Sequence, residues 1–213
     1  MTVDGKPIVL SYDVSRYPFS KIMESHLAVG PLESVHLHYG APTITAENDQ
    51  ETDLHRAMYG IGQEFQLVYR AFVRDWVQPV IGESVVFQAV PSFRYQAPGT
   101  VAVGQWHRDS DFGHGSSEVN IWVPLTLSQR SSSVWMESGP GMQDFAPVVV
   151  PFGCAMFFDA VSLLHGNIKN TSKHTRVSFE FRVIKESCYE ARAERSVKQH
   201  KLFQVGDYFD RFI

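Results

Sequence analysis

The sequence has few cysteines and no long apolar run. Its two cysteines, Cys154 and Cys188, form neither a CxxC pair nor a zinc-binding spacing, so we expect reduced, structural thiols and no thiolate metal site. No stretch approaches the roughly 18 apolar residues of a membrane span. The opening MTVDGKPIVLSYDV lacks the basic and then apolar layout of a signal peptide. We therefore expect a cytoplasmic protein with no membrane partner.

An excess of basic charge is also missing. The chain has 19 Lys and Arg against 23 Asp and Glu, a formal net charge of −4, and its basic residues are scattered. A nucleic-acid-binding face needs clustered basic residues that neutralise phosphates. We expect no nucleic-acid partner and a small-molecule ligand instead.

What the chain does contain is enough apolar sequence for one core. Its 213 residues are 44% hydrophobic and 13% aromatic, which fits a single domain over 1–213. Residues 6–12 are expected to form a strand, residues 33–39 alternate as strands do, and a short helix is expected near 18–28. Between about 49 and 80, apolar side chains recur every three or four residues, which predicts an amphipathic helix that the glycines of 60–62 can break. This helix would pack on a sheet, although the same face can serve a homodimer.

From residue 84 onward the apolar period changes to two. This pattern predicts an α+β, mainly β fold, an eight-strand jelly roll over about 84–184 that is supported by the helices of about 16–80. The C-terminal tail, 185–213, is expected to begin with a short helix over 186–200 and to end in an aromatic segment. The expected strands are at about 84–89, 92–97, 101–107, 118–126, 132–137, 147–150, 153–158 and 175–184.

A His-x-Asp motif stands at the end of the expected strand 101–107. Residues two apart on a strand point to the same side, so His107 and Asp109 can hold one metal ion. The motif is common by chance, and a surface histidine beside a solvated aspartate explains it as well. Taken alone, it decides nothing.

Two later elements extend the motif. His165 follows an apolar strand and precedes a glycine, and Arg176 and Ser178 share a face of the last strand. The arginine can form a bidentate pair with a carboxylate, to which the serine hydroxyl adds a hydrogen bond. A buried structural histidine and a surface salt bridge are the alternatives when each element is taken alone.

The order of these elements is more specific than any one of them. His165 lies 58 residues after His107, and Arg176 follows 11 residues later. Two imidazoles and one carboxylate make the facial triad of non-heme Fe(II) sites, which leaves positions for a 2-oxo acid and for oxygen. The sequence therefore predicts a metal site at His107, Asp109 and His165, with Arg176 and Ser178 as anchors of a 2-oxoglutarate carboxylate.

These motifs resemble the Fe(II)/2-oxoglutarate-dependent oxygenases of the phytanoyl-CoA dioxygenase-like branch over roughly 84–184. Segments such as VPSFRYQAPG, WHRDSDFGH, EVNIWVPLT and RVSFEFRV are most similar to short oxygenases of aminoglycoside and related natural-product gene clusters. The resemblance implies a double-stranded β-helix, cupin-like fold. It also implies iron-dependent oxidation with Fe(II), 2-oxoglutarate and O2, and no catalytic residue beyond the metal ligands.

Further residues near these motifs can contact ligands. Asn120 is a candidate cofactor contact because relatives carry a polar residue on this strand, although an asparagine bonded to nearby backbone fits equally. His114 and Asp111 could replace a metal ligand, but neither has the two-residue spacing. His36 and His38 have that spacing without a third ligand, so an exposed strand face explains them better. The substrate candidates are Arg94, which a structural ion pair explains equally well, with Arg108, Asp111, His114 and Trp122.

The function predicted from these patterns is hydroxylation of a small polar metabolite, such as a sugar, nucleoside or amino-acid derivative. Succinate and CO2 would be the co-products. The alternatives are a cupin-like metal-binding protein and a metalloenzyme without redox chemistry. A serine hydrolase is disfavoured because Ser162 and His165 lack a Gly-x-Ser-x-Gly turn.

Overall fold

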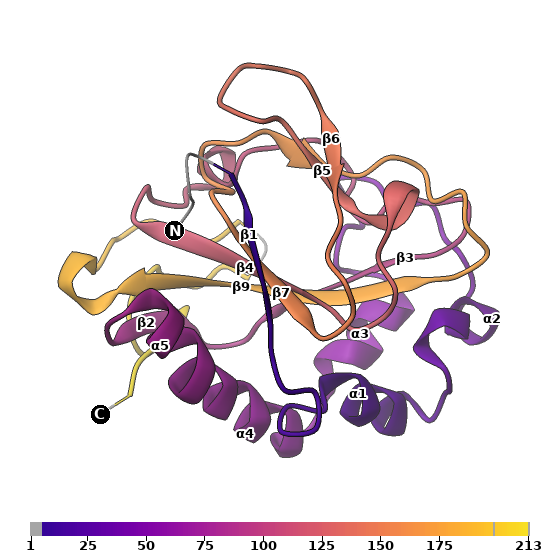
Figure 1. The fold of residues 1–213 in the computed structure, drawn as a ribbon, viewed down its shortest axis with the longest axis horizontal. Helices are drawn as coiled ribbons and strands as arrows, with labels where there is room; N and C mark the ends of the chain where they lie inside the picture. Colours follow the sequence, from indigo (N-terminus) through magenta and orange to yellow (C-terminus); the bar gives the residue numbers. More distant parts are fainter. Residues whose placement is uncertain (1–5, 198, 213) are drawn as a thin grey trace.

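Two antiparallel sheets and a layer of helices organise the part of the chain that the computed structural model describes, residues 6–197 and 199–212 (Figure 1). The small sheet has the order β6 (Ala146–Val148), β5 (Val134–Met136) and β8 (His165–Gly166). The large sheet runs in the order β1 (Ile8–Ser11), β7 (Cys154–Phe158), β4 (Glu118–Pro124), β9 (Arg176–Lys185), β2 (Val85–Gln88) and β10 (Phe209–Asp210), with β3 (Ser92–Gln96) also paired to β9. The mainly β fold with supporting helices is thus confirmed.

Strand β9 is the centre of the large sheet, since it pairs with β2, β3 and β4. Its side chains alternate between two faces, as the pleat of a strand requires. One face carries Val177, Phe179, Phe181 and Val183, all in the main apolar core. The other face carries Arg176, Ser178, Glu180 and Arg182, which point away from that core. One strand therefore divides the molecule into an apolar side and a polar side.

Helices cover the apolar side of the large sheet (Figure 1). They are α1 (Phe19–Leu27), α3 (Asp53–Tyr59), α4 (Gln63–Phe72), a π-helical turn (Val73–Val77) and α5 (Gln78–Ile81). The ring of Phe179 lies 4.9 Å from that of Phe19 and 5.5 Å from that of Phe65. The break expected at 60–62 is present between α3 and α4. No helix in the described ranges is both long and apolar enough to cross a bilayer.

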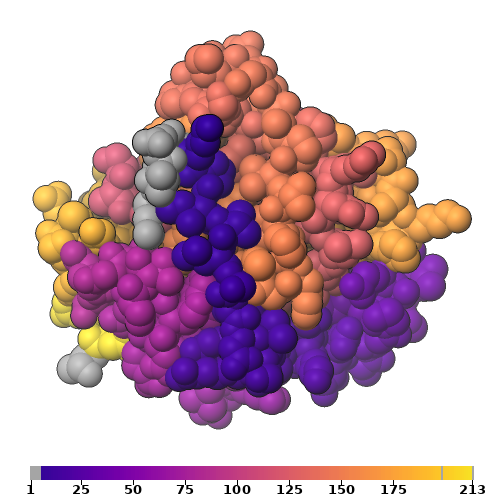
Figure 2. Space-filling model, in the orientation of Figure 1, coloured from indigo at the N-terminus to yellow at the C-terminus, as the bar shows by residue number. Residues whose placement is uncertain are grey.

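The N-terminal strand, β1, forms one edge of the large sheet. Strand β1 pairs with β7 from Ile8 opposite Phe157 to Ser11 opposite Cys154. On the surface shown in Figure 2, this indigo segment runs beside the orange residues of the β7 region. The strand expected at 6–12 is confirmed.

The strand expected at 33–39 is wrong. A 3-10 turn (Leu32–Ser34) and the short helix α2 (His36–Tyr39) occupy this segment. Val35 is fully buried while Leu37 is 75% exposed, so the two residues do not share a buried face. A short alternating run does not distinguish the two structures without knowledge of which side chains are covered.

The strand expected at 101–107 is also wrong, apart from a single bridge between His107 and His165. The segment packs instead against the loop that follows α2. A side chain at Gly104 would come within 2.2 Å of the Thr45 backbone, so only glycine permits this approach. The contact between two loops replaces pairing with a neighbouring strand.

The helix expected over 186–200 is absent from its described residues, while Lys198 lies outside them. A 3-10 turn (Glu186–Cys188) is followed by irregular chain and then by β10. Phe203, Tyr208 and Phe209 form a separate apolar cluster with Val86 and Ile184. Tertiary packing of these aromatic residues on β2 and β9 therefore overrides the local helical pattern. Strands β8 and β10, each two residues long, were not predicted.

Helix α3 buries a neutral histidine, His55, whose Nε2 has no hydrogen-bond partner among the described residues. Burial, aided by the charge of Arg94, lowers the pKa of His55 to about 3. Because the unfolded chain binds a proton that the folded chain excludes, we expect this group to reduce stability as the pH falls from about 6.5 toward 3.

The expected size of this effect is about 1.4 kcal/mol per pH unit within that window. Urea unfolding at pH 7, 6 and 5 would measure it, and His55→Leu should flatten the slope. The exposed His38, changed to leucine, is the control and should leave the slope unaltered. An unchanged slope in His55→Leu would show that His55 is not the source of this pH dependence of stability.

Candidate metal centre

Three potential metal ligands meet between the two sheets. The Nε2 atoms of His107 and His165 lie 3.7 Å and 3.8 Å from Oδ1 of Asp109. All three side chains are buried, and one ligand atom from each lies within 4.8 Å of the others. The structure therefore brings together the three residues that the sequence motif singled out.

Backbone pairing, and not strand spacing, assembles the three residues. The amides of His107 and His165 each donate to the other's carbonyl at 3.0 Å, and the Asp109 amide donates to Ala160 at 2.8 Å. Asp109 itself begins a 3-10 helix (Asp109–Phe112). The expectation that His107 and Asp109 share one face of a strand is wrong, although both side chains reach the site.

Both imidazoles have the tautomer that suits a metal. Nδ1 of His107 lies 3.0 Å from the Gln105 carbonyl, and Nδ1 of His165 lies 2.9 Å from the Leu163 carbonyl. Because a carbonyl oxygen can only accept, each Nδ1 carries the proton. Each Nε2 is then the ring nitrogen that faces Asp109 and can offer a lone pair to a metal.

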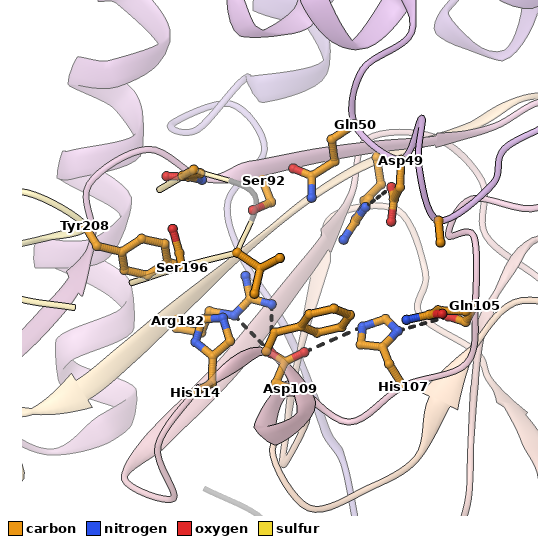
Figure 3. A pocket seen from close by; sticks show the side chains of 15 residues that line it. Asp49, Gln50, Ser92, Gln105, His107, Asp109, His114, Arg182, Ser196 and Tyr208 are labelled. Atoms are coloured by element: carbon orange, nitrogen blue, oxygen red, sulfur yellow. Dashed lines mark hydrogen bonds and ion pairs between the residues drawn. The ribbon is translucent and has the colours of Figure 1, made fainter. Parts of the chain in front are cut away.

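The carboxylate of Asp109 is oriented by a residue that sequence reasoning missed. Arg182 donates to Oδ2 from Nη2 at 2.7 Å and from Nε at 3.0 Å, and Asn120 Nδ2 lies 3.5 Å from the same oxygen. Oδ1 is thereby left to face His107 (Figure 3) and His165. The period-two alternation of β9 places Arg182 on the same face as Arg176. This pattern could have identified Arg182 as a site residue from the sequence.

Electrostatics hold these groups in their ligand forms. Burial, reinforced by His165, lowers the pKa of His107 to about 4. Burial alone would raise the pKa of Asp109, but Arg182 and the nearby histidines outweigh it and hold this pKa well below its ordinary value. Near neutral pH the site presents a neutral imidazole at His107 and an ionised carboxylate. This donor set fits a divalent ion such as Fe(II).

Arg176 lies in a narrow cavity beside both histidines. Its guanidinium donates to Ser178 Oγ at 2.9 Å and to the Ser132 carbonyl at 3.1 Å, and it lies 5.4 Å above the Trp122 ring. No ion pair within 4 Å includes Arg176 among the described residues, although it is buried and remains charged, with a pKa that burial lowers to about 9. The cavity is lined by Arg94, Ala102, Val103, His107, Trp122, Val134, Phe158, His165, Gly166, Asn167, Arg176 and Glu180.

A larger cavity of about 210 Å³ is lined by His107 and Asp109 (Figure 3) and shares His107 and Arg94 with the narrow one. Of the predicted substrate residues, Arg94 and His114 line it, whereas Trp122 lies in the narrow cavity. The loop before α3 and the C-terminal tail complete its wall, which sequence reasoning did not anticipate. The residues contributed by these segments are Ala46, Asp49, Gln50, Ser196, Val197, Gln199 and Tyr208.

The charged residues that were predicted to bind substrate form ion pairs and hydrogen bonds within the protein. Arg94 pairs with Asp49 and lies 3.5 Å from Glu180. His114 Nδ1 lies 2.6 Å from Glu118 Oε2. Asp111 accepts from the Arg108 backbone at 2.9 Å and caps the 3-10 helix. Asp111 is exposed and lines neither cavity, so its prediction as a substrate residue is not supported by its position.

Arg108 likewise lines neither cavity but joins the two ligand-bearing loops. It donates to the Ser162 carbonyl and to Glu137 Oε1, each at 2.9 Å, and Glu137 accepts from the Leu164 amide at 2.7 Å. Glu137 is buried and was not predicted as a site residue. The ion pair between Arg108 and Glu137 therefore connects the loop that carries His107 to the loop that carries His165.

From this contact we expect Arg108→Met to weaken Fe(II) binding by about 10- to 100-fold, as changes to residues behind metal ligands do. An anaerobic Fe(II) titration followed by tryptophan fluorescence would measure the affinity. Arg130→Met, at an exposed arginine, is the matched control. Unchanged iron affinity in Arg108→Met would remove the positioning role.

Comparison with known proteins identifies solved structures of the same fold and a relative in sequence. No model of a known protein family matches the chain. Solved structures share the fold: EctD from S. alaskensis has a TM-score of 0.58 and 15% identity, covering 89% of this chain and 75% of its own. The non-heme monooxygenase ThoJ has a TM-score of 0.54 and 14% identity, covering 97% and 82%.

These similarities establish the fold, and the triad offers three ligands to one metal ion. StrG of Streptomyces griseus, a streptomycin biosynthesis protein, is 34% identical to this chain over 201 residues, 94% of this chain and 96% of StrG. The chain belongs to the same family as StrG.

Proposed function

We propose that the protein is an Fe(II)- and 2-oxoglutarate-dependent dioxygenase that hydroxylates a small polar metabolite in natural-product biosynthesis. The observation that carries this proposal is Arg176, a buried cation without a carboxylate partner among the described residues, in the same cavity as His107 and His165. A buried charge is costly unless it is paired. The distal carboxylate of 2-oxoglutarate would supply that partner.

Each residue then has a defined task. His107, Asp109 and His165 hold iron, while Arg176 and Ser178 bind the far carboxylate of 2-oxoglutarate. Arg182 and Asn120 orient Asp109, which gives Asn120 a role through the ligand instead of direct contact with the cofactor. When bound, iron and 2-oxoglutarate activate O2, with one oxygen atom entering succinate and the other the substrate as CO2 leaves.

The polar space between the sheets excludes bulk water and holds the substrate near the iron. We also propose that the two sheets form the double-stranded β-helix expected for this family. Their facing arrangement, with the ligands between them, supports that description. A homodimer through α3 and α4 stays a prediction.

The proposal has two competitors, a metal-binding protein of the cupin type and a metalloenzyme without redox chemistry. The Arg176 cavity disfavours both because neither needs a buried carboxylate anchor beside the metal. Asp109 also disfavours halogenation, since halogenases of this kind have a small residue at that point.

Anaerobic addition of Fe(II) and 2-oxoglutarate tests the proposal. We expect a weak visible absorption band in the native protein and its loss in His107→Ala. His114→Ala is the matched control, because this half-buried histidine lines the larger cavity outside the triad. A folded, iron-loaded protein without the band would disprove the oxygenase function.

A further inference from the structure

Among the residues that the structure describes, the charged side chains around the larger cavity are already paired. Asp49 pairs with Arg94, and Asp109 pairs with Arg182 (Figure 3). Glu180 lies between the two arginines, 3.5 Å from Arg94 and 3.7 Å from Arg182. Breaking a buried pair leaves an uncompensated charge and is strongly unfavourable. These groups therefore have no charge to offer a substrate.

The total charge around the metal leads to the same conclusion. Arg94, Arg176 and Arg182 are balanced by Asp49, Asp109 and Glu180. A divalent metal ion and doubly charged 2-oxoglutarate add no net charge to this set. Counted over the described side chains, the loaded site is thus neutral, and a charged substrate would find no counter-ion among them.

Uncharged groups remain free to bind the substrate. Within the described part of the chain, neither the Tyr208 hydroxyl nor the Gln105 side-chain amide has a hydrogen-bond partner, and both residues line the cavity. Phe112 provides an aromatic surface beside the metal ligands, with its ring centroid 5.2 Å from that of His107. A hydroxyl-rich ring is complementary to these groups. Its hydroxyls can form hydrogen bonds with the polar side chains, and its C–H face can pack on the aromatic ring.

The tail places Tyr208 at this position. Phe209 pairs with Gln88 of β2, and the Tyr208 ring lies 4.9 Å from that of Phe203 and 5.8 Å from that of His114. These contacts fix the ring so that its hydroxyl faces the cavity. The volume, about 210 Å³, is below the roughly 300–1,000 Å³ usual for ligand clefts and suits a single ring.

We propose that the substrate group held beside the metal is an uncharged, hydroxyl-rich ring of the sugar or cyclitol class. Phe112 contacts its C–H face, and Tyr208 and Gln105 bind its hydroxyls. This inference rests on the proposed function and narrows its substrate class. Tyr208 and Phe112 are then the residues that determine substrate specificity.

Four probes with one ring and different charges test the inference. Methyl β-glucoside is uncharged, glucosamine is cationic, and glucuronate and glucose 6-phosphate are anionic. Saturation-transfer NMR would measure their binding to the protein loaded with Zn(II) and 2-oxoglutarate. We expect the glucoside to bind at least about tenfold more tightly than any charged probe.

Variants test the two contacts. Phe112→Ala should weaken glucoside binding by about tenfold, and Tyr208→Phe by about 3- to 10-fold, as expected for one lost hydrogen bond. Phe152→Ala removes a phenylalanine that is 50% exposed and outside the cavity, so binding should not change.

Tighter binding of a charged probe, or an unaffected Phe112→Ala, would overturn the substrate class. Failure of all four probes to bind would also overturn it. If the visible band with Fe(II) and 2-oxoglutarate persisted, the oxygenase function would stand. Absence of that band would count against the proposed function itself.

Discussion

Replacing Asp109 by alanine is expected to weaken Fe(II) binding by more than about 100-fold, because even residues behind metal ligands contribute 10- to 100-fold. The same change leaves Arg182 as a buried cation without its closest partner. We therefore also expect a loss of about 3–5 kcal/mol in the free energy of unfolding. Anaerobic iron titration and urea unfolding would measure the two effects.

Asp111→Ala is the control for this prediction. Asp111 stands two residues away and caps the 3-10 helix without facing the histidines. Its loss should cost about 0.5–2 kcal/mol of stability and leave iron binding intact. Equal loss of iron affinity in both variants would show that the loop, and not the Asp109 carboxylate, holds the metal.

Arg176→Met is expected to raise the KM for 2-oxoglutarate by about 10- to 100-fold. The lost interaction is a charge-assisted hydrogen bond, which contributes about 1.5–3 kcal/mol. Methionine occupies similar space but supplies no charge. Succinate formation measured against 2-oxoglutarate concentration would give the KM.

Iron affinity should stay within about threefold in Arg176→Met, because among the described residues Arg176 forms no hydrogen bond with either histidine and lies beside Ser178 and Trp122. Arg56→Met, at a side chain that is 65% exposed, should change neither value. A normal KM for 2-oxoglutarate in Arg176→Met would show that Arg176 does not bind the 2-oxoglutarate carboxylate.

The chemistry of the site was more predictable than its geometry. His107, Asp109 and His165 were identified from residue types and order, although the strand proposed to align the first two does not exist. Arg176 and Ser178 were placed correctly, because a period-two pattern over β9 depends only on local backbone geometry. Arg182 shared that pattern and was still overlooked.

Other roles depended on contacts between distant segments. Arg108 was predicted to bind substrate, but its partners Ser162 and Glu137 are 54 and 29 residues away. Tyr208 reaches the cavity because the tail packs on β2. No local pattern reports either arrangement.

The sequence by itself determined the mainly β core, the metal-binding residue types and the polar face of β9, because periodicity and donor chemistry are local properties. Only the tertiary structure decided that backbone pairing aligns the ligands and that Arg182 orients Asp109. It also decided that the tail completes the cavity. These features arise from burial and ion pairing between segments whose meeting depends on the whole fold.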